Sequence, residues 1–217
     1  MSEMLRWSAV VVVILGCAAA CGSPTDRAAP AITTGTDARS SPQPLPTPRI
    51  PRRTRLYTSV PKACSLINAQ TLRVLAPGAR GIELDPTPAE NITTRTCNWH
   101  VEKNEQIRSL LITANLISSD EFSGPAKRAE DEFQRLVREQ SDIDKRNARP
   151  IIGLGDEAQL SATEKPFRQT HLRIRSQNVL LTIVFNATDN GRSLALAALN
   201  DRAIAAGRAA LLALAAR

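Results

Sequence analysis

The chain has 217 residues, of which 42% are hydrophobic and 23% are charged. This balance excludes a fully disordered chain, and the length accommodates one domain together with a targeting segment and a tail. Aromatic residues contribute only 3%, so the predicted core is built from Leu, Ile, Val and Ala.

The net charge of +7 is unevenly distributed along the chain. The segment between Cys21 and Cys64 carries a net charge of +5, whereas residues 64–217 carry only +2. A nucleic-acid-binding protein normally carries its basic surface on the folded domain. The charge distribution therefore predicts that DNA and RNA are not partners of this protein.

Residues 1–20 have the pattern of an export signal. Arg6 supplies a short positive region, residues 10–15 are all aliphatic, and small residues follow. The apolar stretch 7–20 is shorter than the roughly 20 residues that a membrane-spanning helix requires. We therefore expect a signal peptide rather than a permanent transmembrane anchor.

The end of this segment resembles a bacterial lipoprotein signal, in which small residues precede a cysteine that becomes the acylated N-terminus. Cys21 follows three alanines, and Cys17 is the alternative because Ile14 gives it the better aliphatic residue at position −3. Cleavage before Cys17 would leave Cys21 as an odd cysteine in an oxidising compartment. We therefore expect lipidation at Cys21, and localisation at the extracytoplasmic face of the cell membrane through the lipid.

Residues 21–62 are expected to form a disordered linker. Eight of the chain's 14 prolines lie here among Ser, Thr and Ala, and such a segment cannot bury enough apolar surface to fold. The proline-rich run 42–48 favours extended polyproline conformations and a semi-rigid spacer. The basic cluster at residues 52–55 could contact anionic lipids or wall polymers, or it could simply promote solubility.

The folded domain is expected to span residues 63–217 and to begin at a cysteine. An exported domain meets an oxidising compartment, so Cys64 and Cys97 are expected to form a disulfide. Asn68 is a plausible N-cap for a short helix that ends at Ala76 before Pro77-Gly78. Residues 81–93 are expected to form an irregular loop.

Hydrophobic periodicity predicts the remaining elements. Apolar residues alternate with polar ones over 97–101 and 107–117, which indicates two strands, and three- and four-residue spacing over 125–140 indicates a helix. A strand near 158–162, a hairpin of 170–175 with 179–186, and a helix over 193–216 follow. This order predicts an α+β fold, an antiparallel sheet with helices packed mainly on one face.

Several short motifs resemble the DUF3558 family of actinobacterial lipoproteins. They are a cysteine followed by Ser-Leu-Ile and a helix, then Cys97-x-Trp99, then residues 153–158 with the sequence GLGDEA, then an Arg-rich strand ending at Asn178-Val179-Leu180. The order of the motifs along residues 63–217 carries the resemblance. It implies an exported, lipid-anchored protein whose biochemistry is unknown. Sensor domains of membrane kinases look similar to this family, which suggests ligand sensing by analogy.

No motif predicts a catalytic, cofactor or metal site. Residues 153–155 lack the helix and the third glycine of a nucleotide loop, so a turn before a strand is expected. Asp156 and Glu157 are expected to point to opposite faces and to be solvated or paired with Arg173 or Arg175. His100 and His171, the only histidines, do not supply the three or four ligands of a metal site.

Two classes of function remain open from the sequence. The favoured one is a non-catalytic binding or sensing domain, whose expected partners are an envelope small molecule, a wall polymer or a membrane protein. The alternative is a cell-wall or small-molecule hydrolase with an unrecognised active site. A cleft lined by His100 or His171 with a carboxylate would favour the hydrolase, and an apolar cleft without titratable groups would favour binding.

Overall fold

The computed structural model describes residues 55–140, 148–164 and 167–216. The expected signal peptide, both candidate lipidation cysteines and most of the expected linker lie outside these residues. The elements of the described chain are η1 (Ala63–Leu66), α1 (Ala69–Leu75), β1 (Arg80–Ala89), β2 (Ile92–Lys103), β3 (Gln106–Ile117), α2 (Pro125–Arg138), β4 (Arg149–Pro150), β5 (Glu157–Thr163), β6 (Gln169–Ser176), β7 (Val179–Asp189), β8 (Arg192–Ser193) and α4 (Leu196–Ala215).

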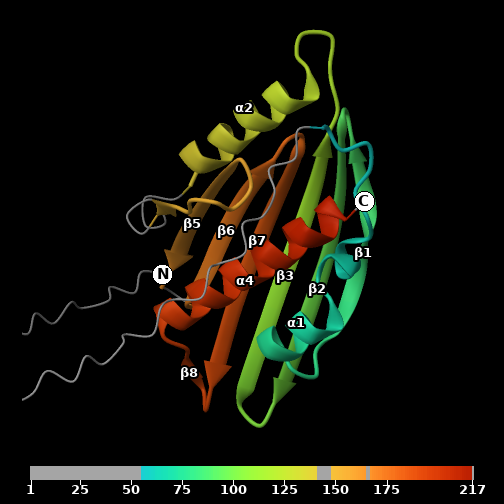
Figure 1. Ribbon diagram of the computed structural model, residues 1–217. Helices are drawn as coiled ribbons and strands as arrows, with labels where there is room; N and C mark the ends of the chain where they lie inside the picture. The colour runs from blue at the N-terminus through green and yellow to red at the C-terminus, as the bar shows by residue number, and fades with distance from the viewer. Residues whose placement is uncertain (1–54, 141–147, 165–166, 217) are drawn as a thin grey trace, which may run out of the picture. The chain divides into compact units, whose positions relative to one another are not determined.

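The described strands form one antiparallel sheet, crossed by a long helix (Figure 1). Their order is β1-β2-β3-β7-β6-β5-β4, and the short β8 pairs with the end of β7. All pairings between neighbouring strands of the described residues are antiparallel. The predicted α+β class is therefore confirmed.

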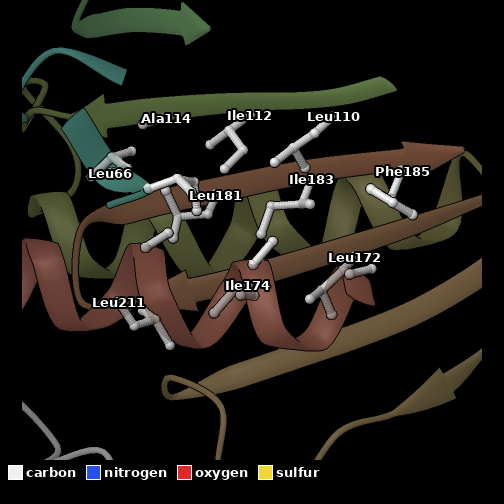
Figure 2. Close-up of a cluster of buried hydrophobic side chains, with 14 of the residues drawn as sticks. Leu66, Leu110, Ile112, Ala114, Leu172, Ile174, Leu181, Ile183, Phe185 and Leu211 are labelled. Carbon is white, nitrogen blue, oxygen red and sulfur yellow. The ribbon is translucent and has the colours of Figure 1, made fainter. Parts of the chain in front are cut away.

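One face of the sheet carries the main core. Strands β3 and β7 direct Leu110, Ile112, Leu181, Ile183 and Phe185 to the same side because side chains alternate along a strand. The aliphatic face of α4 covers these residues (Figure 2). The Ala- and Leu-rich helix thus packs one face across the sheet, as the sequence predicts.

Close approach of α4 to the sheet depends on Gly207 in the middle of the helix. A Cβ atom at this position would lie 2.8 Å from the terminal methyl carbons of both Leu172 and Ile174 on β6. The helix backbone therefore sits directly on the side chains of β6.

None of the helices in the described part of the chain is both long enough and apolar enough to cross a membrane.

Helix α2 packs on the opposite face of the sheet. Ala129 and Phe133 contact Ile117 of β3 and Leu180 of β7, and Leu180 points away from its neighbour Leu181 in the main core. The predicted arrangement is confirmed, because η1, α1 and α4 share one face and α2 covers one end of the other (Figure 1).

The predicted irregular loop over residues 81–93 is wrong. These residues form most of β1 and the first residues of β2. Strand β1 is the outermost strand and pairs only with β2, a position at which a residue such as Pro86 is tolerated. Its apolar residues Ile82 and Leu84 are exposed, so the strand has no buried alternation for a sequence pattern to show.

The ends of the domain differ slightly from the expected boundaries. Tyr57 and Val60, in the segment expected to be linker, are buried in the main core. Ser193, expected to start the last helix, belongs to β8, and α4 begins at Leu196. Asn68 caps α1 as expected, because its side chain accepts a hydrogen bond from the Thr71 amide at 2.8 Å.

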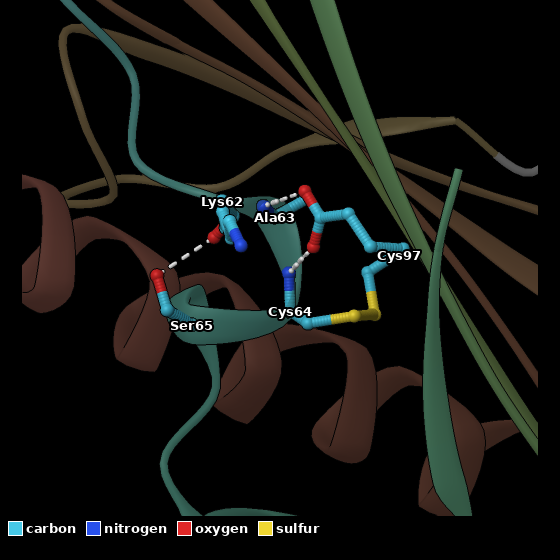
Figure 3. Close-up of a disulfide and its surroundings, with 6 residues drawn as sticks. Lys62, Ala63, Cys64, Ser65 and Cys97 are labelled. Atoms are coloured by element: carbon cyan, nitrogen blue, oxygen red, sulfur yellow. Dashed lines mark hydrogen bonds between the residues drawn. A yellow bond between two sulfur atoms is a disulfide. The ribbon is translucent and has the colours of Figure 1, made fainter. Parts of the chain in front are cut away.

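The predicted disulfide joins Cys64 of η1 to Cys97 of β2, with their Cα atoms 5.0 Å apart (Figure 3). The carboxylate of Glu83 on β1 accepts hydrogen bonds from the amides of Ala63 and Cys64, each at 2.7 Å. Gly81 leaves the space that the ring of Trp99 fills, since a Cβ there would lie 2.6 Å from the indole nitrogen. The N-terminal segment is thus fixed to β1 and β2 by a covalent bond and by two backbone hydrogen bonds.

Replacing both Cys64 and Cys97 with Ala is expected to lower the free energy of unfolding by roughly 3 to 4 kcal/mol, the loop-closure value for a bridge across 33 residues. Urea unfolding with and without a phosphine reductant measures the difference. The reductant should destabilise the wild-type chain and leave the double variant unchanged. Peptide mapping that finds Cys64 and Cys97 as free thiols in the unreduced chain would contradict the bridge.

Candidate functional site

The Gly-Leu-Gly segment, residues 153–155, forms the turn before β5. Gly153 and Gly155 both have positive φ, +79° and +70°, and Leu154 between them is 2% exposed in the main core. A Cβ on Gly155 would overlap the carbonyl oxygen of Arg175 and lie 2.7 Å from the Ile174 side chain. The segment is therefore a structural turn that packs against β6, as predicted.

Asp156 and Glu157 converge on one guanidinium group. Arg175 Nε lies 2.6 Å from Glu157 Oε2, and Arg175 Nη1 lies 3.4 Å from Asp156 Oδ2. The expected pairing with Arg175 is confirmed, but the expectation that the two carboxylates face apart is wrong. Strand alternation does not separate them because Asp156 precedes β5, which begins at Glu157.

The hairpin between β6 and β7 is held from both sides. Asp156 Oδ2 accepts a hydrogen bond from the Gln177 amide at 2.6 Å. The side chain of Asn178 donates to the carbonyl oxygens of Tyr57 and Ile117, each at 3.0 Å, and accepts from the Tyr57 amide at 2.8 Å. The hairpin turn thus ties the N-terminal segment, β3 and the turn before β5 together.

An open cleft of about 430 Å³ lies between α2 and the β4–β5 edge of the sheet. Its walls combine apolar side chains from α2 and from the segment after β4 with polar groups of β5, and its lining is Phe133, Gln134, Val137, Pro150, Ile151, Ile152, Gly153, Gly155, Asp156, Glu157, Ala158 and Gln159. The volume lies within the range of small-molecule sites, which are mostly apolar with a few fixed polar groups. Ile152 lines the cleft and is 98% exposed. The cleft therefore includes an apolar side chain that is almost fully accessible to solvent.

The polar groups of the cleft are already engaged with one another. Glu157 Oε2 accepts from Arg175, and Glu157 Oε1 accepts from Gln134 Nε2 at 3.0 Å. These contacts hold the carboxylates in place around one guanidinium, leave the group with a formal charge of −1, and favour a fixed polar wall over a proton-transfer role. Gln159 Oε1 is buried and has no hydrogen-bond partner among the described residues, so an acceptor lies beside the cleft.

The two histidines are not brought together and do not line this cleft. His100 is exposed on β2 and faces away from buried Trp99, as expected. His171 is half-buried on β6 on the same side of the sheet as His100. Three strand spacings, about 14 Å, separate their strands, so the pair does not form a metal site.

A second group of potential metal ligands consists of Cys64, Glu83 and Cys97, whose ligand atoms lie within 4.8 Å of one another. The two sulfur atoms are bonded to each other, and the carboxylate accepts two backbone hydrogen bonds. The structural contacts account for this cluster.

Charged groups within α2 and in the loop before it make local contacts. Hydrogen bonds from the amides of Phe122 and Ser123 lower the pKa of Asp120. A hydrogen bond from Arg135 lowers the pKa of Glu132. Each partner lies within three residues along the chain, which indicates local structural roles for these carboxylates.

Most of the cleft residues were not singled out by the sequence. The motif at residues 153–158 was recognised, but the contributions of Phe133, Val137 and Ile152 were not. The only signal was the pair Ile151-Ile152 directly before a glycine turn, where two aliphatic residues are unusual for a loop.

Comparisons of the chain with protein-family models, with curated proteins and with solved structures found no match.

Proposed function

We propose that this protein is a cell-envelope lipoprotein whose extracytoplasmic domain binds or senses a small molecule without catalysis. The observation that supports this most is the cleft between α2 and β5, where apolar walls surround carboxylates that Arg175 and Gln134 already engage. The resemblance to the DUF3558 lipoproteins supports an envelope location. A wall polymer or a membrane protein remains an expected alternative partner.

The chemistry of the cleft favours an amphipathic ligand. Phe133, Val137 and Ile151 offer apolar surface, and each buried CH₂ group of a ligand contributes about 0.8 kcal/mol. Gln159 lines the cleft, and its buried Oε1 would accept from a hydroxyl or amine group of a ligand if the side chain turned toward the cleft. The carboxylates of Asp156 and Glu157 share the single guanidinium of Arg175, which leaves a formal charge of −1 on this wall, so the ligand is expected to be uncharged or cationic where it enters the cleft.

Native mass spectrometry of the full chain with envelope lipids, muropeptides and metabolites tests this proposal. A ligand that binds the cleft should bind Ile152→Asp about tenfold more weakly, a loss of about 1.4 kcal/mol. Val74→Asp is the matched control, because Val74 is 70% exposed on α1. Equal binding by both variants would place the ligand elsewhere and contradict the assignment of the cleft.

One observation favours the hydrolase alternative. Ser161 of β5 lies directly opposite His171 of β6, as a nucleophile and its base require. Ser161 is 1% exposed, however, and its hydroxyl accepts from Gln140 Nε2 at 3.4 Å. Ester hydrolysis that is lost in Ser161→Ala would establish the alternative.

Cys21→Ala is expected to block lipidation, and Cys17→Ala is expected to leave it intact. Both residues lie outside the described part of the chain, so this prediction comes from the signal sequence alone. Two or more acyl chains on one residue anchor a protein firmly, whereas a single chain binds only marginally. Mass spectrometry of the mature N-terminal peptide measures the outcome, and an acylated peptide beginning at Cys17 would contradict it.

A further inference from the structure

The polar side chains of the cleft between α2 and β5 are rich in hydrogen-bond acceptors. Gln134, Asp156, Glu157 and Gln159 line the cleft, and none of its described lining residues is basic. Arg175 reaches the two carboxylates from β6 and is not itself part of the lining. Because two carboxylates share one guanidinium, this wall of the cleft keeps a formal charge of −1.

One carboxylate oxygen of this wall has no partner. Asp156 Oδ2 accepts from the Gln177 amide at 2.6 Å and contacts Arg175 at 3.4 Å, whereas Oδ1 accepts no hydrogen bond from a described residue. The side chain of Asp156 is 18% exposed and lines the cleft, so a ligand there can reach it. Gln159 makes no side-chain hydrogen bond to another described residue, so its Oε1 can turn toward the cleft without the loss of one.

The other side chains that line the cleft are apolar. Phe133 and Val137 belong to α2, and Ile151 and Ile152 precede the glycine turn. A ligand that fills this space of about 430 Å³ therefore buries apolar surface and meets a negatively charged wall at the same time. An anionic ligand would place a like charge beside the carboxylates, which is unfavourable.

We propose that the ligand of this cleft is an amphipathic amine in its cationic form, with its ammonium group at Asp156 and its apolar part against Phe133, Val137 and Ile151. An ammonium group has donors and no acceptor, so it complements the free oxygen of Asp156. A charge-assisted hydrogen bond of this kind is roughly twice as strong as a neutral one. The inference rests on the proposed function for the location of the ligand and adds its charge and chemical class.

The test titrates the full chain with hexylamine, hexan-1-ol and hexanoate at pH 7, three probes that share a six-carbon skeleton and differ in charge. The same detergent is used throughout, so that partitioning into micelles is common to all the proteins compared. NMR signals of the amides of Gly155, Glu157 and Ala158 report binding in the cleft. The wild type should bind hexylammonium about five- to tenfold more tightly than hexan-1-ol, and hexanoate most weakly. The net charge of +7 would by itself favour hexanoate, so the expected order reports the local wall.

Asp156→Asn is the informative variant, because it keeps an oxygen for the Gln177 amide and removes the negative charge. It should bind hexylammonium about five- to tenfold more weakly than the wild type. Its affinity for hexan-1-ol should be unchanged, which also shows that the cleft is intact. Asp201→Asn is the matched control, since it removes the same charge from an exposed position on α4. It should bind all three probes as the wild type does.

Equal affinities of the wild type for hexylammonium and hexan-1-ol at the cleft would overturn the cationic assignment and leave the proposed function intact. Equal losses of hexylammonium binding in Asp156→Asn and Asp201→Asn would overturn it too, because overall charge would then be the cause. If none of the probes shifts the cleft amides, the proposed function itself is contradicted. The comparison of the three probes in the wild type decides the question even if Asp156→Asn does not fold.

Discussion

Gly155→Ala is expected to lower the free energy of unfolding by about 3 kcal/mol or more, from backbone strain together with a steric clash. Gly155 has φ of +70°, and its missing Cβ would overlap the carbonyl oxygen of Arg175. Backbone atoms of a paired strand cannot move aside as a flexible side chain can. Urea unfolding followed by circular dichroism measures the loss.

Gly153→Ala is the matched control for this experiment. Gly153 has a similar φ of +79°, but a Cβ there would meet no atom within 4 Å. The variant should therefore show only the cost of the left-handed backbone, about 1 to 2 kcal/mol. Equal losses for the two variants would contradict the close packing of the turn against Arg175.

Asn178→Ala is expected to cost about 3 to 5 kcal/mol, because it removes three hydrogen bonds and leaves buried backbone groups unsatisfied. Asn178 is 3% exposed, and its side chain satisfies groups of both Tyr57 and Ile117. The midpoint and slope of urea unfolding measure the effect. Hydrogen exchange at the amide of Tyr57 should also become faster, since this amide loses its acceptor.

Asn186→Ala provides the comparison on β7, the strand that follows Asn178. Asn186 is half-buried on the face of β7 opposite the main core, and the structure shows no side-chain hydrogen bond between it and another described residue. Its replacement should change stability by less than about 1 kcal/mol. A loss as large as that of Asn178→Ala would show that the network around the hairpin is not the cause.

These two predictions concern residues of two short sequence motifs, residues 153–158 and Asn178-Val179-Leu180. Leu154 is buried in the core, Gly155 permits the contact with β6, and Asn178 fixes the hairpin. Cys64 and Cys97 fix the N-terminal segment. The motifs therefore describe how the domain is held together, which explains why they predict a fold without predicting a ligand.

The candidate cleft shows the limit of sequence reasoning. Asp156 and Glu157 were recognised as a pair but were expected to face apart, because the start of β5 could not be located to the residue. This convergence on Arg175 leaves no local pattern.

Local sequence patterns are sufficient to predict the elements whose residues repeat with a buried period: β3, the β6–β7 hairpin, α2 and α4. The sequence also predicts the cap at Asn68 and the pairing of Cys64 with Cys97. Only the tertiary structure revealed β1, because an edge strand with exposed apolar residues has no buried face to produce a period. Likewise, only the tertiary structure brought α2 against the β4–β5 edge to form the cleft, since strand order and helix placement depend on contacts between residues far apart in the chain.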